Sequence, residues 1–524
     1  MKKIKLSLKF LKQVVSEIGM IRTCLYFLFL IVLYSLNSMQ PILITMLVSS
    51  RAVLNSDSIV IIITLVASFF AIGLVERLNS SFLQNIRYST KKILWRKVLY
   101  RSTDLFREKS AGETLELINE ASASARSIQY HGIQALMRLF VSLVVYALSV
   151  SAISSFAGLT FFFGYIIFII FSTWSMRENP ALITKALQAT GVVNDNLIDN
   201  FKNVDIVFAF QALEKEEYRM NNYLDKERQE YLDVQTRLDN LSLYQKTINF
   251  VILAIMLTVC YLQKGEIPIT IIVVSIYALF TFDGLGKGLV ELWEDIHRLS
   301  EAIIALSGGE RTLIVANNVS NTSFFILAKD LAIGYNDNPI LKGINFIVKP
   351  GQVVEIRGPN GIGKTTLLRT IAGIIKPLNG KIQIGFLDRI AYVSQDSTLF
   401  NRTVIENICY PDEPHDIEGV FELTQRIGLS SLIAQPEDLI KYKPGDFGEK
   451  FSGGEIQKVL LARAIISGAK LVILDEILNS LDKESVAWLK YEFRNIFHDR
   501  IVFFVSHQDF INADIILNLS EFKD

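Results

Sequence analysis

The chain has 524 residues, of which 53 are basic and 53 acidic, so its formal net charge is zero. Hydrophobic residues make up 50% and charged residues 20%, with a mean hydropathy of +0.34. These values exclude a disordered chain and a generally basic nucleic-acid binder. They also exceed what an ordinary soluble protein shows, so the composition predicts a protein that lies at least partly in a membrane. The three cysteines have neither metal-ligand nor CxxC spacing, so we expect no zinc site and no disulfide framework.

The first twenty residues contain five lysines interleaved with apolar side chains. No small-residue cleavage site closes a short apolar core, so a removable signal peptide is not expected. We predict instead a basic amphipathic helix that lies on the cytoplasmic membrane surface before the first span.

Six apolar segments approach the ~20 residues that a bilayer core requires. They are Cys24–Leu47, Ile59–Val75, Ala135–Ser154, Leu159–Trp174, Thr247–Leu262 and Ile267–Gly284. The polar stretches after the second and fourth segments carry ten and nine Lys or Arg, whereas the other three connections are short. The positive-inside rule then places both termini and both long loops in the cytoplasm. Because stretches such as Leu213–Leu241 lack Gly and Pro, these loops are predicted to be helical extensions of the spans.

A complete phosphate-binding loop follows the membrane half. It fits GxxxxGK[ST] and reads Gly358-Pro359-Asn360-Gly361-Ile362-Gly363-Lys364-Thr365. An apolar strand precedes it and a helix that begins with Thr366 follows it, so its backbone N–H groups and the helix N-terminus are expected to bind phosphates. Lys364 is predicted to reach the β- and γ-phosphates of a nucleotide and the Thr365 hydroxyl to hold Mg²⁺, with Thr366 beside them.

A second motif stands about a hundred residues further on. Leu471–Leu474 is a run of four apolar residues, typical of a buried parallel strand, and it ends in Asp475 and Glu476. We expect Asp475 to bind Mg²⁺, and Glu476 to orient or deprotonate the attacking water. ATP with Mg²⁺ is therefore the predicted cofactor pair.

Between these motifs, the sequence Phe451-Ser452-Gly453-Gly454-Glu455 resembles the signature of ATP-binding cassette (ABC) transporters, usually Leu-Ser-Gly-Gly-Gln. The resemblance implies that Ser452, Gly453 and Gly454 bind the γ-phosphate in the opposite subunit's site, so that two chains enclose two ATP molecules. It also implies roles for four further residues. Tyr335 would stack on adenine, Gln395 would sense Mg²⁺ and couple to the membrane domain, Asp482 would belong to the D-loop, and His507 would lie near the γ-phosphate.

The resemblance narrows to exporters that carry both domains in one chain. Leu399–Ile408 and Gly445–Gly448 resemble exporter segments. Phe106 with Gly112-Glu113, and the stretch Asn203–Glu214, resemble the two cytoplasmic regions that carry coupling helices. The expected fold is a six-helix, all-α transmembrane domain of ABC exporter type at residues 1–308. A cytoplasmic α/β P-loop ATPase domain is expected at residues 309–524.

Two departures from the family pattern concern the signature. Phe451 and Glu455 replace the usual Leu and Gln, and the acidic side chain weakens ATP closure if it points inward and is harmless if it points outward. The chain also stops soon after Ile516, so less contact between two ATPase domains is expected. None of these departures removes a predicted catalytic group, so a homodimer with two competent sites is the preferred assembly, with a heterodimer as the alternative.

The predicted function is ATP-driven export of a small peptide or an amphipathic small molecule across a bacterial inner membrane by alternating access. A lipid flippase, a siderophore-type importer and an ATP-gated regulator use the same fold and stay open as alternatives. An exporter that trims its own peptide cargo is not expected, since no protease domain precedes the first span. Asp283, Asn37 and Gln40 are polar residues in predicted spans, and each either borders a substrate cavity or caps and packs its helix.

Overall fold

The computed structural model describes residues 2–49, 56–99, 111–175, 179–283, 285–306, 325–335, 338–384, 389–394, 396–445, 448–477, 481–505 and 511–522. These residues form two compact units, and the division between them falls within residues 307–324. The predicted domain boundary between residues 308 and 309 lies outside the described residues.

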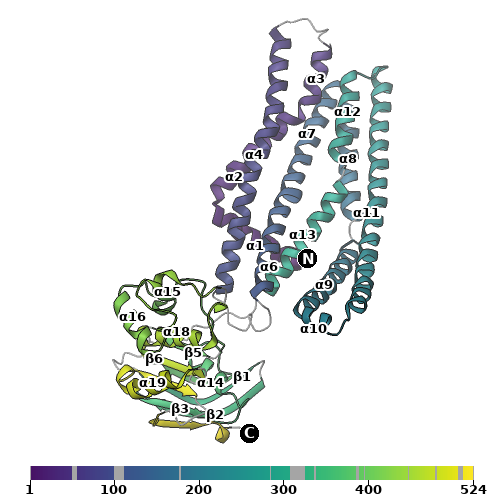
Figure 1. The fold of residues 1–524 in the computed structure, drawn as a ribbon. Coiled ribbons are helices and arrows are strands. Elements are labelled where there is room, and N and C mark those ends of the chain that lie inside the picture. The colour runs from purple at the N-terminus through teal and green to yellow at the C-terminus, as the bar shows by residue number, and fades with distance from the viewer. Residues whose placement is uncertain are drawn as a thin grey trace. The chain divides into compact units, whose positions relative to one another are not determined.

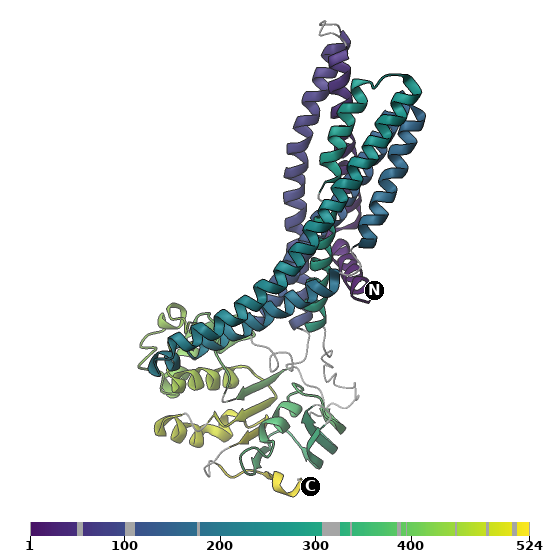
Figure 2. The same cartoon turned by 90° about the vertical axis from the view of Figure 1, so that its right-hand side faces the viewer.

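All secondary-structure elements among the described residues of the first unit are helices (Figure 1). Its elements are α1 (Lys2–Ile18), α2 (Met20–Ser38), α3 (Gln40–Ser49), α4 (Ser56–Leu99), α6 (Ala111–Ser127), the π-helix η1 (Ile128–Gln134), α7 (Ala135–Ile153), α8 (Ser155–Ser175), α9 (Asn179–Lys202), α10 (Val204–Ala209), α11 (Leu213–Lys264), α12 (Ile269–Phe282) and α13 (Leu285–Ala305). Figure 2 shows α11 as one continuous helix of 52 residues, far longer than a span requires. The predicted helical extension of the fifth span is therefore present.

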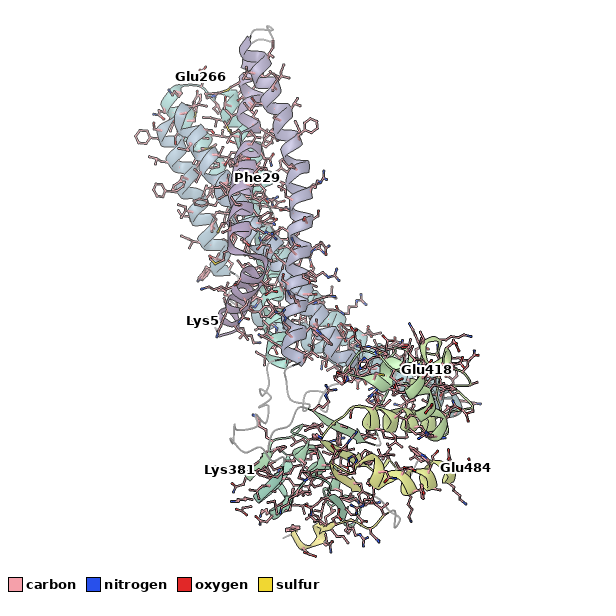
Figure 3. The ribbon with its side chains drawn as sticks, turned by 90° about the vertical axis from the view of Figure 1, so that its left-hand side faces the viewer. Lys5, Phe29, Glu266, Lys381, Glu418 and Glu484 are labelled. Carbon is pink, nitrogen blue, oxygen red and sulfur yellow. The ribbon has the colours of Figure 1, made fainter. Side chains whose placement is uncertain are left out.

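Five of the helical segments are long and apolar enough to cross a membrane: Met20–Val48, Ile59–Leu99, Gly112–Ile153, Ser155–Ser175 and Leu213–Lys264. Each of these five segments contains one of the first five predicted spans. Only Ser154, the last residue of the third predicted span, lies outside its segment. The sixth predicted span contains the shorter apolar helix α12. The first span is interrupted at Met39, because Pro41 in the next turn cannot donate a backbone hydrogen bond to α2. Large apolar side chains such as Phe29 point away from the bundle, as expected of a lipid-facing surface (Figure 3).

The core of this unit is aromatic where α7, α8, α11 and α12 meet. Phe161, Tyr165 and Phe168 of α8 and Phe282 of α12 are essentially fully buried. The Tyr165 and Phe282 ring centroids lie 4.1 Å apart, and the Tyr165 hydroxyl donates to Asn249 Oδ1 of α11. The phenol therefore buries its ring while its only polar atom is satisfied.

The second unit is an α/β domain with two sheets. Antiparallel strands β1 (Ile326–Tyr335), β2 (Asn338–Val348) and β4 (Asn379–Ile384) form one sheet in the order β2-β1-β4. The other sheet is parallel and has the order β5-β6-β7-β3-β8, with β5 (Ile390–Ser394), β6 (Leu471–Asp475), β7 (Ile501–Val505), β3 (Val353–Arg357) and β8 (Ile515–Asn518). The helices are α14 (Lys364–Ile371), α15 (Val404–Cys409), α16 (Ile417–Arg426), α17 (Asp438–Lys441), α18 (Gly453–Ile466), α19 (Lys483–Ile496) and the short 3₁₀ helix η5 (Leu519–Phe522).

Every residue of β6 and β7 is buried, which explains why their sequences read as continuous apolar runs rather than as alternating patterns. Hydrophobic clusters cover both faces of the parallel sheet. Ligands of such sheets bind beyond the carboxyl ends of the strands, where Arg357 of β3 and Asp475 of β6 lead into the two sequence motifs. The predicted order of a helical domain followed by an α/β P-loop domain is confirmed.

The close approach of α7 and α8 generates a stability prediction. A Cβ built on Gly158 would lie 1.9 Å from Ser151 Oγ and 2.7 Å from Ser151 Cα. Gly158→Ala is therefore expected to push the two helices apart and to lower the free energy of unfolding by about 1–3 kcal/mol. Thermal unfolding of the detergent-solubilised chain measures this change.

The matched control is Gly191→Ala in α9, where a built Cβ meets nothing within 4 Å. Because alanine is the better helix former by about 1 kcal/mol, this substitution is expected to leave the unfolding temperature unchanged or to raise it. Equal effects of the two substitutions would contradict the proposed steric constraint.

Candidate functional site

The phosphate-binding loop connects the end of β3 to the first turn of α14. Gly363 caps this helix with φ 110°, and a Cβ there would lie 3.2 Å from Ile340 Cγ2, so the position favours glycine both conformationally and sterically. Gly358 and Gly361 also have positive φ. The loop thereby exposes backbone N–H groups at a helix N-terminus, which is the arrangement that binds phosphate.

Lys364 closes this loop on itself. Its Nζ donates to the Gly358 carbonyl at 3.0 Å, and to the Pro359 carbonyl and Asn360 Oδ1 at 3.3 Å each. The side chain is buried, at 7% exposure. Three neutral acceptors surround the ammonium, and none is a carboxylate, so its charge is available to an anionic ligand.

The two acidic residues stand at the end of β6, beside this loop. In the strand register, Asp475 lies opposite Val505 of β7, and Glu355 of β3 lies opposite Phe504 of β7. Asp475 is therefore level with the last residues of β3, just before Gly358. Glu476 has φ 58°, a left-handed conformation that costs a non-glycine residue free energy and that is common at functional sites.

Asp475 has the surroundings of a metal ligand. Its carboxyl is 3% exposed, and burial raises its pKa, with the neighbouring Glu476 adding to the shift and the Thr365 hydroxyl opposing it. Its Oδ2 accepts from the Tyr392 hydroxyl at 3.4 Å, whereas its Oδ1 is buried with no hydrogen-bond partner among the described residues. A buried carboxylate oxygen left unpaired next to a hydroxyl fits the oxygen ligands of Mg²⁺.

Two residues of this network are absent from the sequence prediction. Tyr392 of β5 contacts Asp475, and burial together with the Asp475 charge raises the pKa of its phenol to about 12. Arg369 of α14 opposes this rise in the Tyr392 pKa. No local motif marks either residue, because strand pairing between β5 and β6 is what brings them to the site. Tyr335, predicted to meet adenine, contacts Thr366 through a 3.1 Å hydroxyl–hydroxyl hydrogen bond, which places it next to the loop.

Several predicted positions lie outside the described residues. They are Gln395, His507, Asn479, Ser480, Asp446 and Phe106. Their predicted roles stay predictions.

The signature motif forms the start of α18. Ser452 is the N-cap: its hydroxyl accepts from the Glu455 N–H at 3.3 Å, while Glu455 Oε2 accepts from the Ser452 N–H at 2.7 Å. This is a capping box, a role that Glu and Gln fill equally well. The Glu455 carboxylate therefore folds back onto the start of its own helix. Phe451 packs in the hydrophobic core at 8% exposure, which accommodates the aromatic side chain.

Asp482, predicted as a nucleotide contact, has partners within its own chain. It caps α19 by accepting from the Ser485 N–H at 2.8 Å, and it forms an ion pair with Lys458 of the signature helix. Lys458 Nζ also donates to the Gly428 carbonyl at 2.7 Å. The hydrogen bonds and the ammonium lower the pKa of the Asp482 carboxyl to about 2. Lys458 thus connects the signature helix to the end of the D-loop, and spacing alone did not single it out.

The three polar span residues have different surroundings. Gln40 is buried and donates to Ser68 Oγ at 3.1 Å, which is a packing role. Asp283 ends α12 in an extended conformation, 4.0 Å from Lys246 Nζ, which places it at a helix end. Asn37 lines a cavity between helices α2, α4 and α7.

The phosphate loop generates a binding prediction. Lys364→Ala removes the single ammonium from the loop and is expected to weaken ATP binding at least about tenfold, the usual effect of losing a charge-assisted hydrogen bond. Titration with a fluorescent ATP analogue measures this. Lys376→Ala, an exposed lysine just after α14, is the matched control and is expected to bind as the wild type does.

The Lys458–Asp482 pair generates a stability prediction. Lys458→Met leaves the half-exposed Asp482 without its partner and is expected to lower the free energy of unfolding by about 1 kcal/mol, discounted for solvent screening. Because the carboxyl pKa is depressed in the folded state, this contribution is complete above pH 3.8 and is lost as the pH falls toward about 2. Trp488 of α19 reports local unfolding once the other three tryptophans are replaced by Phe. A difference from the wild type that persists unchanged at pH 2 would contradict the assignment.

Comparison with known proteins agrees with this site. The family model described as ABC transporter matches residues 341–479. The beta-(1→2)glucan export ATP-binding/permease protein of Rhizobium etli is 26% identical over 352 residues, 63% of this chain and 60% of that protein. The toxin RTX-III translocation ATP-binding protein of Actinobacillus pleuropneumoniae is 26% identical over 381 residues, 66% of this chain and 52% of that protein. This chain thus matches about three fifths of the first relative's length and about half of the second's.

The whole fold resembles a solved structure. A bacterial Atm1-family ABC exporter with ATP bound superposes with a TM-score of 0.78, covering 95% of this chain and 94% of that one at 20% identity. This likeness shows the fold, in which a helical membrane domain precedes an ABC ATPase domain. The ATPase domain of the present chain accordingly binds ATP.

Proposed function

We propose that this chain, an ABC exporter half-transporter with N-terminal membrane helices and a C-terminal ABC ATPase domain, hydrolyses ATP to move a small peptide or an amphipathic molecule out of the cell. One observation carries the proposal. The sheet register places Asp475 and Glu476 beside the loop that surrounds Lys364, so phosphate binding and water activation share one edge of the sheet.

Each residue of this site has a separate role in the proposed binding and hydrolysis of ATP. Lys364 and the loop N–H groups hold the phosphates and place the bond to be broken, and Tyr335 faces the base. Thr365 and Asp475 are the residues that would hold Mg²⁺, which when bound neutralises charge on the phosphates. Glu476, the residue that follows Asp475 at the end of β6, orients the attacking water and accepts a proton from it.

A half-transporter requires a second half, and we propose a second copy of the same chain. The signature helix begins with free N–H groups and Ser452, a second phosphate-binding terminus within the ATPase unit. In a homodimer this terminus closes on the partner's nucleotide, so ATP favours the closed state and hydrolysis releases it. Gln395 and His507 are expected to complete that closed site.

The membrane unit supplies the moving part. Helix α10, within the predicted coupling region, buries none of its side chains and exposes Ile206 and Phe208 at 55% and 60%. Exposed apolar side chains of this kind mark a surface suited to contact with another protein domain. The lysine-rich α1 and the turn at Glu266 lie at opposite ends of the unit (Figure 3), and we assign the α1 end to the cytoplasmic side of a bacterial inner membrane.

Glu476→Gln tests the proposal. The wild type in lipid nanodiscs is expected to hydrolyse ATP, and the variant to bind ATP normally while hydrolysing it at least about a hundredfold more slowly, because the neutral amide cannot accept the proton. A coupled phosphate assay measures hydrolysis, and uptake of labelled peptides into inside-out vesicles measures transport.

Glu484→Gln, an exposed carboxylate at the start of α19, is the matched control and is expected to keep full activity. A wild type as inactive as Glu476→Gln in every lipid would overturn the self-sufficient homodimer and point to a partner chain. ATP hydrolysis without any uptake of peptide into the vesicles would overturn the proposed export function and favour the ATP-gated regulator.

A further inference from the structure

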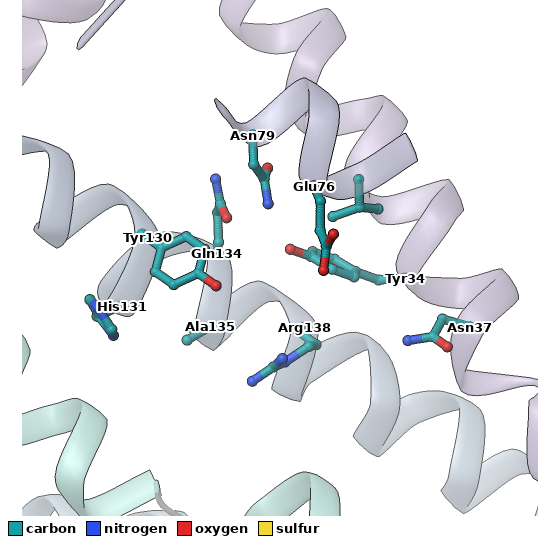
Figure 4. Close-up of a pocket in the computed structure, with 10 residues that line it drawn as sticks. Tyr34, Asn37, Glu76, Asn79, Tyr130, His131, Gln134, Ala135 and Arg138 are labelled. Carbon is teal, nitrogen blue, oxygen red and sulfur yellow. The ribbon is translucent and has the colours of Figure 1, made fainter. Parts of the chain in front are cut away.

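A polar cleft lies between α2, α4, η1 and α7 of the membrane unit, and the ATP chemistry does not use it (Figure 4). One cavity there measures about 210 Å³, and a neighbouring cavity of about 510 Å³ shares Glu76, Asn79, Tyr130 and His131 with it. Four shared lining residues make the two cavities one cleft. Its size suits a small molecule rather than a macromolecule.

Two charged side chains from different helices face this cleft. Figure 4 shows Glu76 of α4 and Arg138 of α7 on opposite sides of the cavity, and Arg126 of α6 lines its extension. Glu76 directly follows the predicted second span, and Arg138 is the fourth residue of the predicted third span. Charges at or within spans are costly, and this cost makes them candidates for function.

These charged side chains are not neutralised by ion pairs within the described part of the chain. Among the described residues, Glu76, Arg126 and Arg138 form no ion pair within 4 Å, whereas the nearby His131 is paired with Glu291 at 2.9 Å. An acid and two bases that face one cleft without neutralising each other remain available to a ligand that carries both signs of charge.

Between the charged side chains, the cleft is lined by the amide side chains of Gln134 and Asn79, which hydrogen bonds hold in place. We call this lining the amide wall. Gln134, 2% exposed, donates through Nε2 to the Tyr26 hydroxyl at 2.5 Å, and this hydroxyl donates to Asn79 Oδ1 at 2.5 Å. Gln134 Oε1 is buried and has no hydrogen-bond partner in the described part of the chain. A buried acceptor with spare capacity beside an anchored amide matches the donors and acceptors of a peptide group.

Backbone geometry gives this wall its shape. Tyr130, His131 and Gln134 all come from η1, a seven-residue π-helix inserted between α6 and α7. Such segments occur often at functional sites, because the extra residue turns side chains to a face that a regular helix would not offer. Packing holds the π turn in place: a Cβ on Gly132 would lie 2.6 Å from Leu292 Cδ1 of α13.

We infer that this cleft binds a small zwitterionic molecule of the short-peptide type, with its ammonium group on Glu76 and its carboxylate on Arg138. The amide wall of Gln134 and Asn79 meets the backbone between the two charged ends. This inference rests on the proposed export function, since it names the cargo that the membrane unit selects. A phosphatidylethanolamine headgroup shares the same chemistry, an ammonium joined to an anion, and the experiment separates the two sources.

The test measures binding to the full chain in phosphatidylglycerol nanodiscs without nucleotide. The probes are trialanine, N-acetyl-trialanine and trialanine amide. The wild type is expected to bind trialanine about tenfold or more tightly than either blocked form, as expected of a charge-assisted contact. Glu76→Gln should abolish the preference over the acetylated form alone, and Arg138→Gln the preference over the amide alone.

Glu266→Gln and Arg22→Gln are the matched controls, since both side chains lie outside the cleft, and both should keep the wild-type preferences. Glycerophosphoethanolamine binding more tightly than trialanine, and losing that affinity in Glu76→Gln, would support the shared chemistry and assign it to a lipid headgroup. Equal wild-type affinity for all probes, or preferences that survive Glu76→Gln and Arg138→Gln, would overturn the inference.

ATP hydrolysis measured on the same nanodiscs separates this inference from the proposed function. Active hydrolysis together with absent probe selectivity overturns the cargo assignment alone. Absent hydrolysis together with Glu76-dependent selectivity overturns the pump and leaves the binding site supported.

Discussion

The pairing of β7 with both β3 and β6 is the constraint on which the ATP site depends. The phosphate loop and the acidic pair are more than a hundred residues apart in the chain, and each is chemically incomplete alone. Parallel pairing brings the ends of both strands to one sheet edge, so Asp475 is buried next to the loop with an unpaired oxygen. The cost of that burial is the physical reason the site is suited to a cation and a phosphate chain.

Near this sheet edge, charged side chains of the ATPase unit hold neighbouring helices and loops in place. Lys458 contacts Asp482 and the carbonyl of Gly428 in the turn after α16, and Arg463 of α18 donates from its Nε to the Asn407 carbonyl at 2.6 Å. Burial lowers the pKa of the Arg463 guanidinium to about 10, which still leaves it charged at neutral pH. The signature helix is therefore held by the surrounding elements at several points.

The apolar spans of the membrane unit concentrate their polar groups in one place. The core at α8 is aromatic, and many large apolar side chains of the spans are exposed, while carboxamides and unpaired charges gather in the cleft beside η1. Such a distribution is expected where a membrane helix must bind a polar ligand without exposing polar groups to lipid. The π-helix is the local distortion that permits it.

The sequence by itself determined the two-domain order, the spans and the phosphate-binding loop, because each depends on local spacing: a run of apolar residues of bilayer length, or glycines at fixed positions before Lys364. It also identified Asp475 and Glu476, since a buried parallel strand reads as an uninterrupted apolar run. Only the tertiary structure decided the roles of Tyr392, Lys458 and Asp482, because their partners lie on elements distant in the chain. The same holds for the cleft, where Glu76 and Arg138 look like ordinary flanking charges until α4 and α7 place them across one cavity. Long-range pairing has no local signature, and that is why these contacts could not be predicted from the residues alone.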